Sequence, residues 1–384
     1  MSKKVAHLIR KNTQLRSSFI QNQILNHINY EPVVIYRYRS KRNDGGFAEY
    51  NDSYLELNLS KNKLIDFNFR YLKKLSKADV KKVLNFLDYQ DVSILHFHYG
   101  TDAGIYTDVI RYSGRPSVIS FYGYDAFSFE KKFLGYGKIF LNNKTFKYAS
   151  KVFAMSPEMK KDLLQIGCPK DKILIHYHGV PSHMFKGIKN SYYQVGQNFT
   201  LLNISSFDPV KGHLFILNAI KKLILLNIKN VKLRLIGKGF FEQEIRKFVE
   251  KNHLIEYVDI LGPIKYGSKE MLTELKNADV FIHPSVTTKN DKEGIPGSIV
   301  EAMLTGLPVI STFHGGIPYI INDGVTGFLV KEWDVDELSK KIKMLKNDIT
   351  LREKIGRACQ KFAIEQLDLH KKERELENIY DSLL

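Results

Sequence analysis

The sequence predicts an α/β protein made of two Rossmann-like domains and a helical tail, and three observations support this prediction. Short apolar runs rich in Val, Ile, Leu and Phe alternate with longer amphipathic segments, which is the pattern of parallel strands crossed over by helices. A polar, glycine-containing stretch at residues 186–197 interrupts the alternation, and a second β/α series follows it. Only helical patterns follow Val330.

The apolar runs predict six strands in each domain. The expected strands are residues 5–9, 32–36, 94–97, 117–121, 151–155 and 173–176, then 200–205, 232–236, 258–261, 280–283, 308–311 and 327–330. The expected helices are 17–27, 77–87, 103–112 and 157–167, then 212–226, 242–252, 269–276 and 298–305, with 334–346, 351–364 and 367–384 in the tail. The domains expected are 1–185, a linker at 186–198, 199–365, and a last helix at 366–384 that packs back towards the first domain.

Composition narrows the class of protein. A chain of 384 residues can bury two cores, and two distant cysteines favour a reducing compartment. No apolar run resembles a signal peptide or a membrane span, so we expect a cytoplasmic protein, with peripheral attachment to the inner face of the membrane left open.

The net charge of +17 attracts polyanions, anionic lipid or phosphorylated substrates, although a lysine-rich surface that simply solvates its helices is an equal alternative. No helix-turn-helix, zinc-finger or RNP-like signature occurs, so we expect no nucleic-acid partner. Binding of a polyanion on a Rossmann-like scaffold stays as an alternative.

The segment 283–330 contains the densest group of unusual residues. A strand ends at His283, a loop carries Glu293, and a helix begins near Ser298 with Glu301 in its first turns. The free amides of that helix start favour a diphosphate. The adjacent glycines Gly315 and Gly316 let the backbone approach a ligand closely.

This segment resembles a family of retaining glycosyltransferases, the family 4 or "glycosyl transferases group 1" type, which contains sucrose synthase and many bacterial polysaccharide transferases. The resemblance rests on Glu293, seven residues, Glu301, then Ala-Met-x-x-Gly-x-Pro-Val-Ile and Gly-Gly-Ile-Pro. The stretch LLNISSFDPVKGHLFILNAI adds Lys211, and looser matches extend over essentially the whole chain. The fold implied is GT-B, in which two Rossmann-like domains face each other across a cleft.

The resemblance also implies roles for individual residues. Glu301 would bind the ribose, Glu293 would lie beside the donor sugar, and Lys211 would hold the diphosphate. The residues expected to take part in catalysis are Glu293, Lys211 and Tyr122. The residues expected to bind the donor nucleotide are Glu301, Lys211, Ser206, Lys238, Gly294, Ile295, Pro296, Gly297, Ser298, Gly315, Gly316 and Pro263, and those on the acceptor side are His98, Gly123 and Asp125.

The activity implied is retaining transfer of a hexose-type sugar from a UDP- or GDP-linked donor to a glycan acceptor. The acceptor would be lipid-linked, in bacterial surface polysaccharide biosynthesis, and neither a cofactor nor a metal is expected. A catalytically degenerate protein that binds a nucleotide or glycan is the main alternative. It stays open because the chain departs from the family at three positions.

The departures lie at Ser206, Tyr122 and Tyr319. Many relatives have arginine at the first position, histidine before glycine at the second and glutamate at the third. Lys238, in a glycine-flanked turn, is a candidate replacement for the missing arginine.

Three features have an ordinary structural explanation beside a functional one. His96 and His98 alternate like a metal pair, as do His176 and His178, but no third ligand lies nearby in sequence, which favours core histidines. Asp334 and Asp336 stand at a helix start, where aspartates act as caps. The segment 129–151 mixes apolar residues with lysines that include Lys131, Lys132 and Lys138, so it is either a basic face that docks on anionic lipid or an ordinary surface helix.

Overall fold

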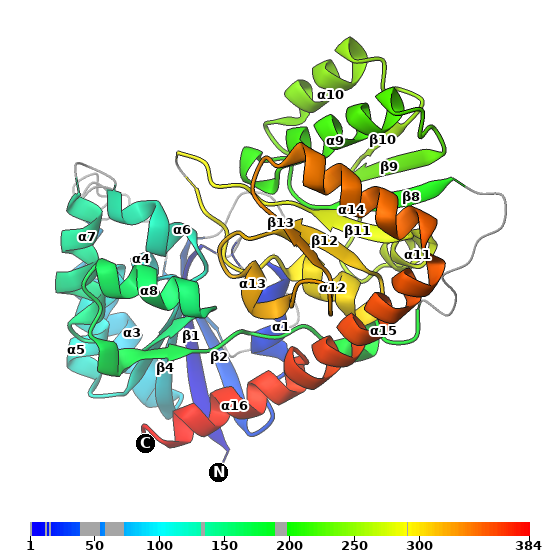
Figure 1. Ribbon diagram of the computed structural model, residues 1–384. Coiled ribbons are helices and arrows are strands. Elements are labelled where there is room, and N and C mark those ends of the chain that lie inside the picture. The colour runs from blue at the N-terminus through cyan, green and yellow to red at the C-terminus, as the bar shows by residue number, and fades with distance from the viewer. Residues whose placement is uncertain are drawn as a thin grey trace. The chain divides into compact units, whose positions relative to one another are not determined.

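The computed structural model describes residues 2–11, 14, 17–38, 54–57, 73–131, 135–188, 198–289 and 291–384. These residues form two compact units, here called unit 1 (residues 1–179 and 369–384) and unit 2 (residues 180–368). Each unit is a parallel β-sheet with helices packed on it (Figure 1). The predicted pair of Rossmann-like domains is confirmed.

Unit 1 contains a seven-stranded parallel sheet in the order β3-β2-β1-β4-β5-β6-β7. Its strands are β1 (Lys3–Lys11), β2 (Tyr30–Tyr38), β3 (Tyr54–Glu56), β4 (Val92–His98), β5 (Ser117–Ser120), β6 (Lys151–Ala154) and β7 (Ile173–Ile175). The six strands predicted here are confirmed. The seventh, β3, was missed because a three-residue strand is too short for an apolar pattern to stand out.

The helices of unit 1 are α1 (Ser18–Leu25), α3 (Lys77–Tyr89), α4 (Gly100–Ile105), α5 (Thr107–Ser113), α6 (Tyr124–Phe127), α7 (Tyr136–Phe140), α8 (Pro157–Gln165) and α16 (Leu369–Asp381). The single helix predicted at 103–112 is wrong, because the chain leaves helical geometry at Tyr106 between α4 and α5. The hydroxyl of Thr107 donates to the carbonyl of Gly104 at 2.7 Å, and such a bond offers the backbone an alternative to the regular helix.

Unit 2 contains a six-stranded parallel sheet in the order β10-β9-β8-β11-β12-β13. Its strands are β8 (Phe199–Ile204), β9 (Val231–Ile236), β10 (Val258–Leu261), β11 (Val280–His283), β12 (Val309–Thr312) and β13 (Phe328–Val330), so all six predictions are confirmed. Its helices are α9 (His213–Leu225), α10 (Glu242–Lys251), α11 (Lys269–Asn277), α12 (Gly297–Thr305), α13 (Ile317–Ile320), α14 (Val335–Asn347) and α15 (Ile349–Gln366).

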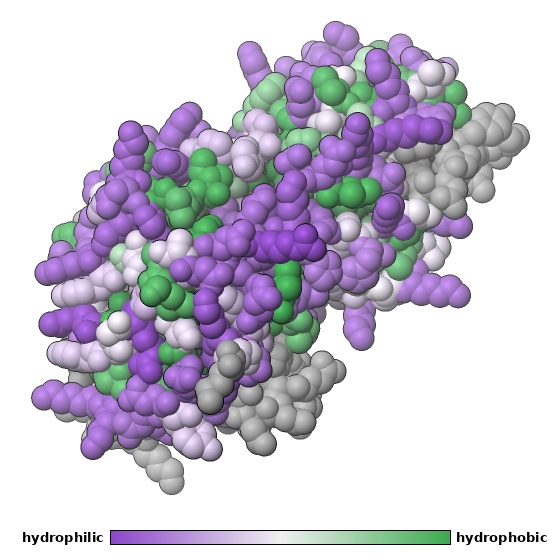
Figure 2. Space-filling model, turned by 90° about the horizontal axis from the view of Figure 1, so that it is seen from below, coloured by the Kyte–Doolittle hydropathy of each residue, from purple (hydrophilic) through white to green (hydrophobic). Residues whose placement is uncertain are grey.

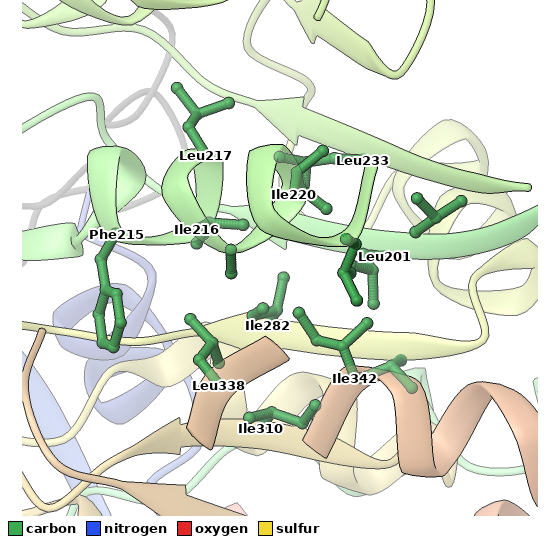
Figure 3. Close-up of a cluster of buried hydrophobic side chains, with 14 of the residues drawn as sticks. Leu201, Phe215, Ile216, Leu217, Ile220, Leu233, Ile282, Ile310, Leu338 and Ile342 are labelled. Carbon is green, nitrogen blue, oxygen red and sulfur yellow. The ribbon is translucent and has the colours of Figure 1, made fainter. Parts of the chain in front are cut away.

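The core of unit 2 lies between the sheet and the helices α9 and α14 (Figure 3). Phe215, Ile216 and Ile220 of α9 follow helical spacing and are fully buried. They pack with Leu338 and Ile342 of α14 over the inward side chains of β8, β11 and β12. This packing holds the central strands, and with them the loops that follow those strands.

The last helix, α16, belongs to unit 1 although it follows unit 2 in sequence. It runs beside the strands of unit 1 in Figure 1. Leu376 and Tyr380 are fully buried in a cluster with Val5, Ile94 and Phe153 from three strands. The chain therefore passes from unit 1 into unit 2 and back again.

The basic segment 129–151 is not one amphipathic helix. A 3-10 turn at Phe129–Lys131 is followed by the short helix α7 and a π-helical turn at Leu141–Phe146, and Lys132 lies outside the described residues. Gly135, the residue at the start of α7, has a left-handed backbone (φ 88°), which favours glycine there. Phe129 and Phe140 are buried in unit 1, so part of the apolar pattern belongs to the core.

Within the described residues, no helix is long and apolar enough to span a bilayer. On the face drawn in Figure 2, hydrophilic side chains predominate and hydrophobic ones form small groups between them. This distribution agrees with a lysine-rich surface that solvates its helices.

We predict that Leu376→Ala destabilises unit 1 by about 2–5 kcal/mol, because it leaves a cavity among buried side chains. The only tryptophan of the chain, Trp333, lies in unit 2, so its fluorescence reports the unfolding of unit 2 whereas circular dichroism reports both units. The circular dichroism transition should move to lower urea while the fluorescence transition stays. Asn378→Ala, on the exposed side of α16, is the control, and an equal shift of both transitions would contradict this division.

Candidate active site

The sheet of unit 2 reverses its strand order next to β8, and this reversal locates the candidate site. Successive strands β8, β9 and β10 step in one direction, whereas β11, β12 and β13 step in the other. Right-handed crossovers therefore carry the chain away to opposite faces of the sheet after β8 and after β11. A crevice at the carboxyl ends of these two strands is the usual ligand site of such sheets.

Lys211 and Glu293, from the loops after β8 and β11, meet at this crevice as an ion pair. Lys211 ends a 3-10 turn, and Gly212 follows it with a left-handed backbone (φ 72°). A β-carbon at Gly212 would lie 1.9 Å from the carbonyl oxygen of Pro284, so only glycine lets the two loops approach this closely. Burial lowers the pKa of Lys211 to about 8, while Asp208 and Asp291 raise it, and the contact with Glu293 also favours the charged form. Lys211 is therefore cationic at neutral pH.

The carboxylate of Glu293 is held on both sides. Its Oε2 accepts a hydrogen bond from the Ser285 hydroxyl at 2.7 Å and lies 3.5 Å from Nε2 of His283. Burial, followed by the nearby charge of Lys211, lowers the pKa of His283 well below its usual value, so this imidazole is neutral. Glu293 thus has one cation and one hydroxyl as fixed partners.

The backbone of Glu293 is anchored by His314. The amide of Glu293 donates to Nε2 of His314 at 3.0 Å, and Nδ1 of His314 lies 2.8 Å from the Glu332 carboxylate. Because the amide can only donate, Nε2 is the acceptor and Nδ1 carries the proton. Burial lowers the pKa of His314, although the bond to Glu332 raises it, so the imidazole acts as a neutral link.

The Gly315-Gly316 pair lies directly against the loop that carries Glu293. A β-carbon at Gly315, whose φ is 52°, would lie 2.1 Å from the carbonyl oxygen of Glu293. The amide of Gly316 donates to the carbonyl of Gly294 at 3.0 Å. The two parts of the sequence pattern, the glutamate loop and the glycine pair, are therefore one structural unit.

Glu301 differs from Glu293 because nothing in the described part of the chain neutralises it. It lies on α12, its exposed fraction is 6%, and no described side chain forms a hydrogen bond or ion pair with its carboxyl group. Burial alone raises the pKa of Glu301 to about 8. A buried carboxyl group without a partner costs stability and is typical of a place where a ligand supplies the missing donors.

The loop 294–296 leads into α12, which begins at Gly297, and Ser298 lies in its first turn. No described side chain caps this helix, and its first turn contains no acidic residue. The amide of Ile299 donates to the carbonyl of Pro296 at 3.1 Å, so the amides of Gly297 and Ser298 are the ones available to an anion. Ile295 and Pro296 are buried where the loop enters the helix.

The remaining donor-side predictions lie at the same edge of the sheet. A β-carbon at Gly237 would lie 1.9 Å from the Ser205 carbonyl oxygen, and the Phe207 amide donates to the Lys238 carbonyl at 2.9 Å. Ser206 and Lys238 are thus neighbours in two packed loops, and both are exposed. Pro263 is exposed after β10 at the sheet margin, and Tyr319 is partly exposed on α13. Their roles stay predictions.

The residues predicted for the acceptor side gather in unit 1, at the end of β4 and in the loop after β5. Nδ1 of His98 lies 2.7 Å from the Tyr122 hydroxyl. The buried carboxyl of Asp125 accepts from the amides of Tyr122 (3.2 Å) and Gly100 (2.7 Å), across the turn at Gly123. Burial raises the pKa of Asp125 to about 6, against these amides. The loop that presents Tyr122 is therefore fixed to the end of β4.

Other polar residues surround His98 in unit 1, and the sequence pattern did not predict them. His7 of β1 pairs in register with His96 of β4, so His7, His96 and His98 come together as three potential metal ligands. The third histidine comes from a strand about 90 residues away in sequence, so local spacing could not reveal it, and His96 and His98 are buried as expected of core histidines. Their ring nitrogens already face hydrogen-bonding partners, as in His7 Nδ1 to His98 Nε2 (2.9 Å) and His96 Nε2 to the Ser120 hydroxyl (2.8 Å). These ring nitrogens therefore already have hydrogen-bonding partners within unit 1.

His7 gave one usable signal, a histidine inside the apolar run Val5–Ile9, but nothing in the sequence indicated its partners. Asp334 caps α14 by accepting from the Glu337 amide at 2.9 Å, as expected. Asp336 pairs with Lys222 on the surface.

Two family models match the chain. Glycosyltransferase Family 4 matches residues 30–183, and Glycosyl transferases group 1 matches residues 186–362. Together they span most of the chain, which belongs to this family of glycosyltransferases.

Named relatives match shorter stretches. WcaL of Salmonella typhimurium, whose name connects it with colanic acid biosynthesis, is 32% identical over 205 residues, which are 52% of this chain and 49% of WcaL. The amylovoran biosynthesis glycosyltransferase AmsK of Erwinia amylovora is 26% identical over 256 residues, 65% of this chain and 60% of AmsK. The chain thus spans about half the length of the first relative and under two thirds of the second.

Solved structures show the fold. HepE from Anabaena, in complex with UDP, superposes with a TM-score of 0.79 at 19% identity, covering 99% of this chain and 100% of HepE. The predicted GT-B fold is confirmed.

We predict that Glu301→Gln stabilises unit 2 at pH 8. The folded pKa of about 8 lies above the ordinary value of 4.5, so the unfolded chain loses this proton first as the pH rises. Wild-type stability therefore falls between pH 4.5 and pH 8 by about 1.4 kcal/mol per pH unit from this group, and the amide abolishes that slope.

The measurement is urea unfolding at pH 5 and pH 8, followed by Trp333 fluorescence. The stability difference between Glu301→Gln and the wild type should shrink towards pH 5. Glu270→Gln, an exposed carboxyl on α11, controls for lost charge. A pH-independent difference would mean that Glu301 is not held protonated by burial.

Proposed function

We propose that this protein is a retaining, metal-independent glycosyltransferase that transfers a hexose-type sugar from a UDP- or GDP-linked donor to a glycan acceptor. The observation that carries the proposal is the meeting of Lys211 and Glu293 at the strand-order reversal of unit 2, beside the uncapped start of α12. A cation and free amides there suit a diphosphate, and a carboxylate next to them suits a sugar hydroxyl.

The chemistry needs no protein nucleophile. The bond between the anomeric carbon and the diphosphate oxygen breaks, and the acceptor oxygen bonds to the same face of that carbon. The acceptor proton passes to the departing phosphate. The protein supplies charge stabilisation for the diphosphate, which Lys211 and the amides of α12 provide, and such preorganised groups are the largest contribution in many enzymes.

Glu301 would complete the donor site. Ribose hydroxyls would give its buried carboxyl the hydrogen-bond donors that the described residues lack. Binding of the nucleotide would favour the ionised form, so the cost of burying this group in the free protein is offset only when the donor is bound. HepE binding UDP, and the polysaccharide roles in the names WcaL and AmsK, support a nucleotide-sugar donor and a bacterial surface polysaccharide as product.

The acceptor would be lipid-linked, and a small exposed patch in unit 1 supports this part of the proposal. Tyr136 and Ile139 of α7 expose 44% and 56% of their surfaces, and Lys131 and Lys138 are exposed close to them in sequence. Aromatic and aliphatic side chains beside lysines suit the interface of an anionic membrane. The enzyme would then work at the cytoplasmic face of the membrane.

The test is a transfer assay with labelled UDP- and GDP-sugars and a lipid-diphosphate-linked glycan. Wild type should form product with the anomeric configuration retained, and Lys211→Met should lower kcat by roughly 10²–10³-fold through loss of charge stabilisation. Lys340→Gln, an exposed lysine of α14, is the control.

Other outcomes would overturn the proposal. Inverted product excludes the retaining mechanism, and tight nucleotide binding without turnover identifies the degenerate alternative. Salt-sensitive binding of a polyanion that sugar nucleotides cannot displace would indicate a polyanion-binding protein on a Rossmann-like scaffold. An unchanged donor KM in Lys238→Ala would show that Lys238 does not replace the missing arginine.

Vesicle flotation tests the membrane part. The protein should float with anionic but not neutral vesicles, and 0.5 M salt should release it since salt at about this strength screens surface charge. Ile139→Ser with Lys138→Gln should weaken flotation, whereas Lys340→Gln should not. Equal recovery with neutral and anionic vesicles would contradict electrostatic docking.

A further inference from the structure

A continuous chain of polar contacts runs through the interior of unit 1 and ends at Tyr122. Tyr122 Oη lies 2.7 Å from Nδ1 of His98, whose Nε2 lies 2.9 Å from Nδ1 of His7. The other nitrogen of His7 lies 2.8 Å from Nε2 of His27. We call His98, His7 and His27 the imidazole chain.

The far end of the imidazole chain meets two carboxyl groups of α16. Nδ1 of His27 lies 3.2 Å from Glu373 Oε2 and 3.6 Å from Glu377 Oε1. Both distances are those of an ion pair, and His27 and Glu373 are almost fully buried. The carboxyl groups come from the helix that returns to unit 1 after unit 2 is complete.

The pKa values of the two carboxyl groups shift in opposite directions. Burial raises the pKa of Glu373, against the pull of His27. Glu377 is also buried, but its ion pair with His27 and hydrogen bonds from the amides of Ile28 (2.6 Å) and Asn29 (3.0 Å) lower its pKa. Glu377 is therefore ionised, and although burial opposes it, the pair of glutamates raises the pKa of His27. His27 is the cation of this buried group.

The charge on His27 determines the direction of every bond in the chain. A protonated His27 has two N–H groups, so its Nε2 donates to Nε2 of His7. Burial lowers the pKa of His7 and His98, which are neutral and have one N–H each. His7 must then donate from Nδ1 to His98, and His98 must donate from Nδ1 to Tyr122.

Tyr122 therefore accepts from His98, and its own O–H is left for a second partner, either the neighbouring hydroxyl of Ser120 or a ligand. Its side chain is partly exposed, whereas all three imidazoles are buried beneath it. We propose that Glu373 and Glu377 act through the imidazole chain as positioning residues, which fix the Tyr122 hydroxyl as a hydrogen-bond donor towards the substrate. This inference rests on the proposed function for the identity of that substrate, a sugar hydroxyl or phosphate oxygen.

Loss of one proton from His27 reverses the direction of every hydrogen bond in the imidazole chain. If His27 becomes neutral, its Nδ1–H stays with the carboxylates and its Nε2 accepts from His7. His7 then accepts from His98, and His98 accepts from the Tyr122 hydroxyl, which turns inward. The groups that face the chain are His96 from β4, Tyr380 from α16, and Tyr99, Asp125 and His178 near Tyr122.

The positions of the protons on the three imidazoles can be measured without an activity assay. Nitrogen-15 NMR of imidazole-labelled protein at pH 7 should show His27 protonated at both nitrogens, and His7 and His98 protonated at Nδ1. In Glu373→Gln with Glu377→Gln the His27 proton should be lost and the tautomers of His7 and His98 should reverse. Protonation of His7 or His98 at Nε2 in the wild type would overturn the inference.

A double-mutant cycle tests the consequence for catalysis. Glu377→Gln should lower kcat about tenfold, the effect of one oriented hydrogen bond, with the donor KM unchanged. In a Tyr122→Phe background the same substitution should have no further effect, because the chain would have nothing left to orient. Additive effects would mean that Glu377 is merely structural. Glu375→Gln, an exposed carboxyl on the same helix, should leave kcat unaltered.

The pH profile gives a second readout. The raised pKa of His27 predicts that kcat falls as the pH rises through it, since the chain then reverses. Glu377→Gln should move this fall to lower pH, whereas a fall caused by Lys211 in unit 2 would not move. If neither the wild type nor any variant transfers sugar, the proposed function fails. The NMR result still decides whether the glutamates set the direction of the hydrogen bonds in the imidazole chain.

Discussion

The reversal of strand order in each sheet is the constraint on which the candidate sites depend. Parallel strands with right-handed crossovers direct their loops to one edge of the sheet, and only at a reversal do two neighbouring loops separate to leave room for a ligand. In unit 2 the reversal lies between β8 and β11, where Lys211 and Glu293 meet. In unit 1 it lies between β1 and β4, where His7 and His98 meet. Each unit therefore gathers its polar side chains at the same topological position.

Burial gives these polar groups their different characters. Glu293 has a cation and a hydroxyl as partners, so its carboxylate is satisfied within the protein. Glu301 has no partner among the described residues, and burial favours its neutral form. The buried imidazoles of unit 1 satisfy each other, because a neutral histidine can donate one hydrogen bond and accept another without water. The free protein thus carries its strain at Glu301, the position where a ligand would relieve it.

Most of the architecture could be predicted because the apolar periodicity of strands and helices is visible in one sequence. All twelve predicted strands formed, and Glu293 and Gly315 were placed in one motif before their contact was visible. Predictions failed where tertiary contacts outweigh the local pattern. At Tyr106 the chain leaves helical geometry and divides a predicted helix. After Phe129 the chain forms several short helical turns, and part of their apolar residues is buried in the core of unit 1. The link between His27 and Glu377 spans most of the chain and has no local signal. Registers and long-range partners of this kind follow from packing, which periodicity does not encode.

The return of α16 to unit 1 has a consequence for synthesis on the ribosome. Unit 2 is continuous from Val180 to Asp368 and can fold as soon as it has emerged, whereas the buried core of unit 1 includes Leu376 and Tyr380, which are synthesised after the whole of unit 2. The sheet of unit 1, which is made before unit 2, keeps an uncovered apolar face until α16 has emerged. Completion of unit 1 thus depends on synthesis of α16, and a chain that stops before Leu369 would present that uncovered face to chaperones and proteases.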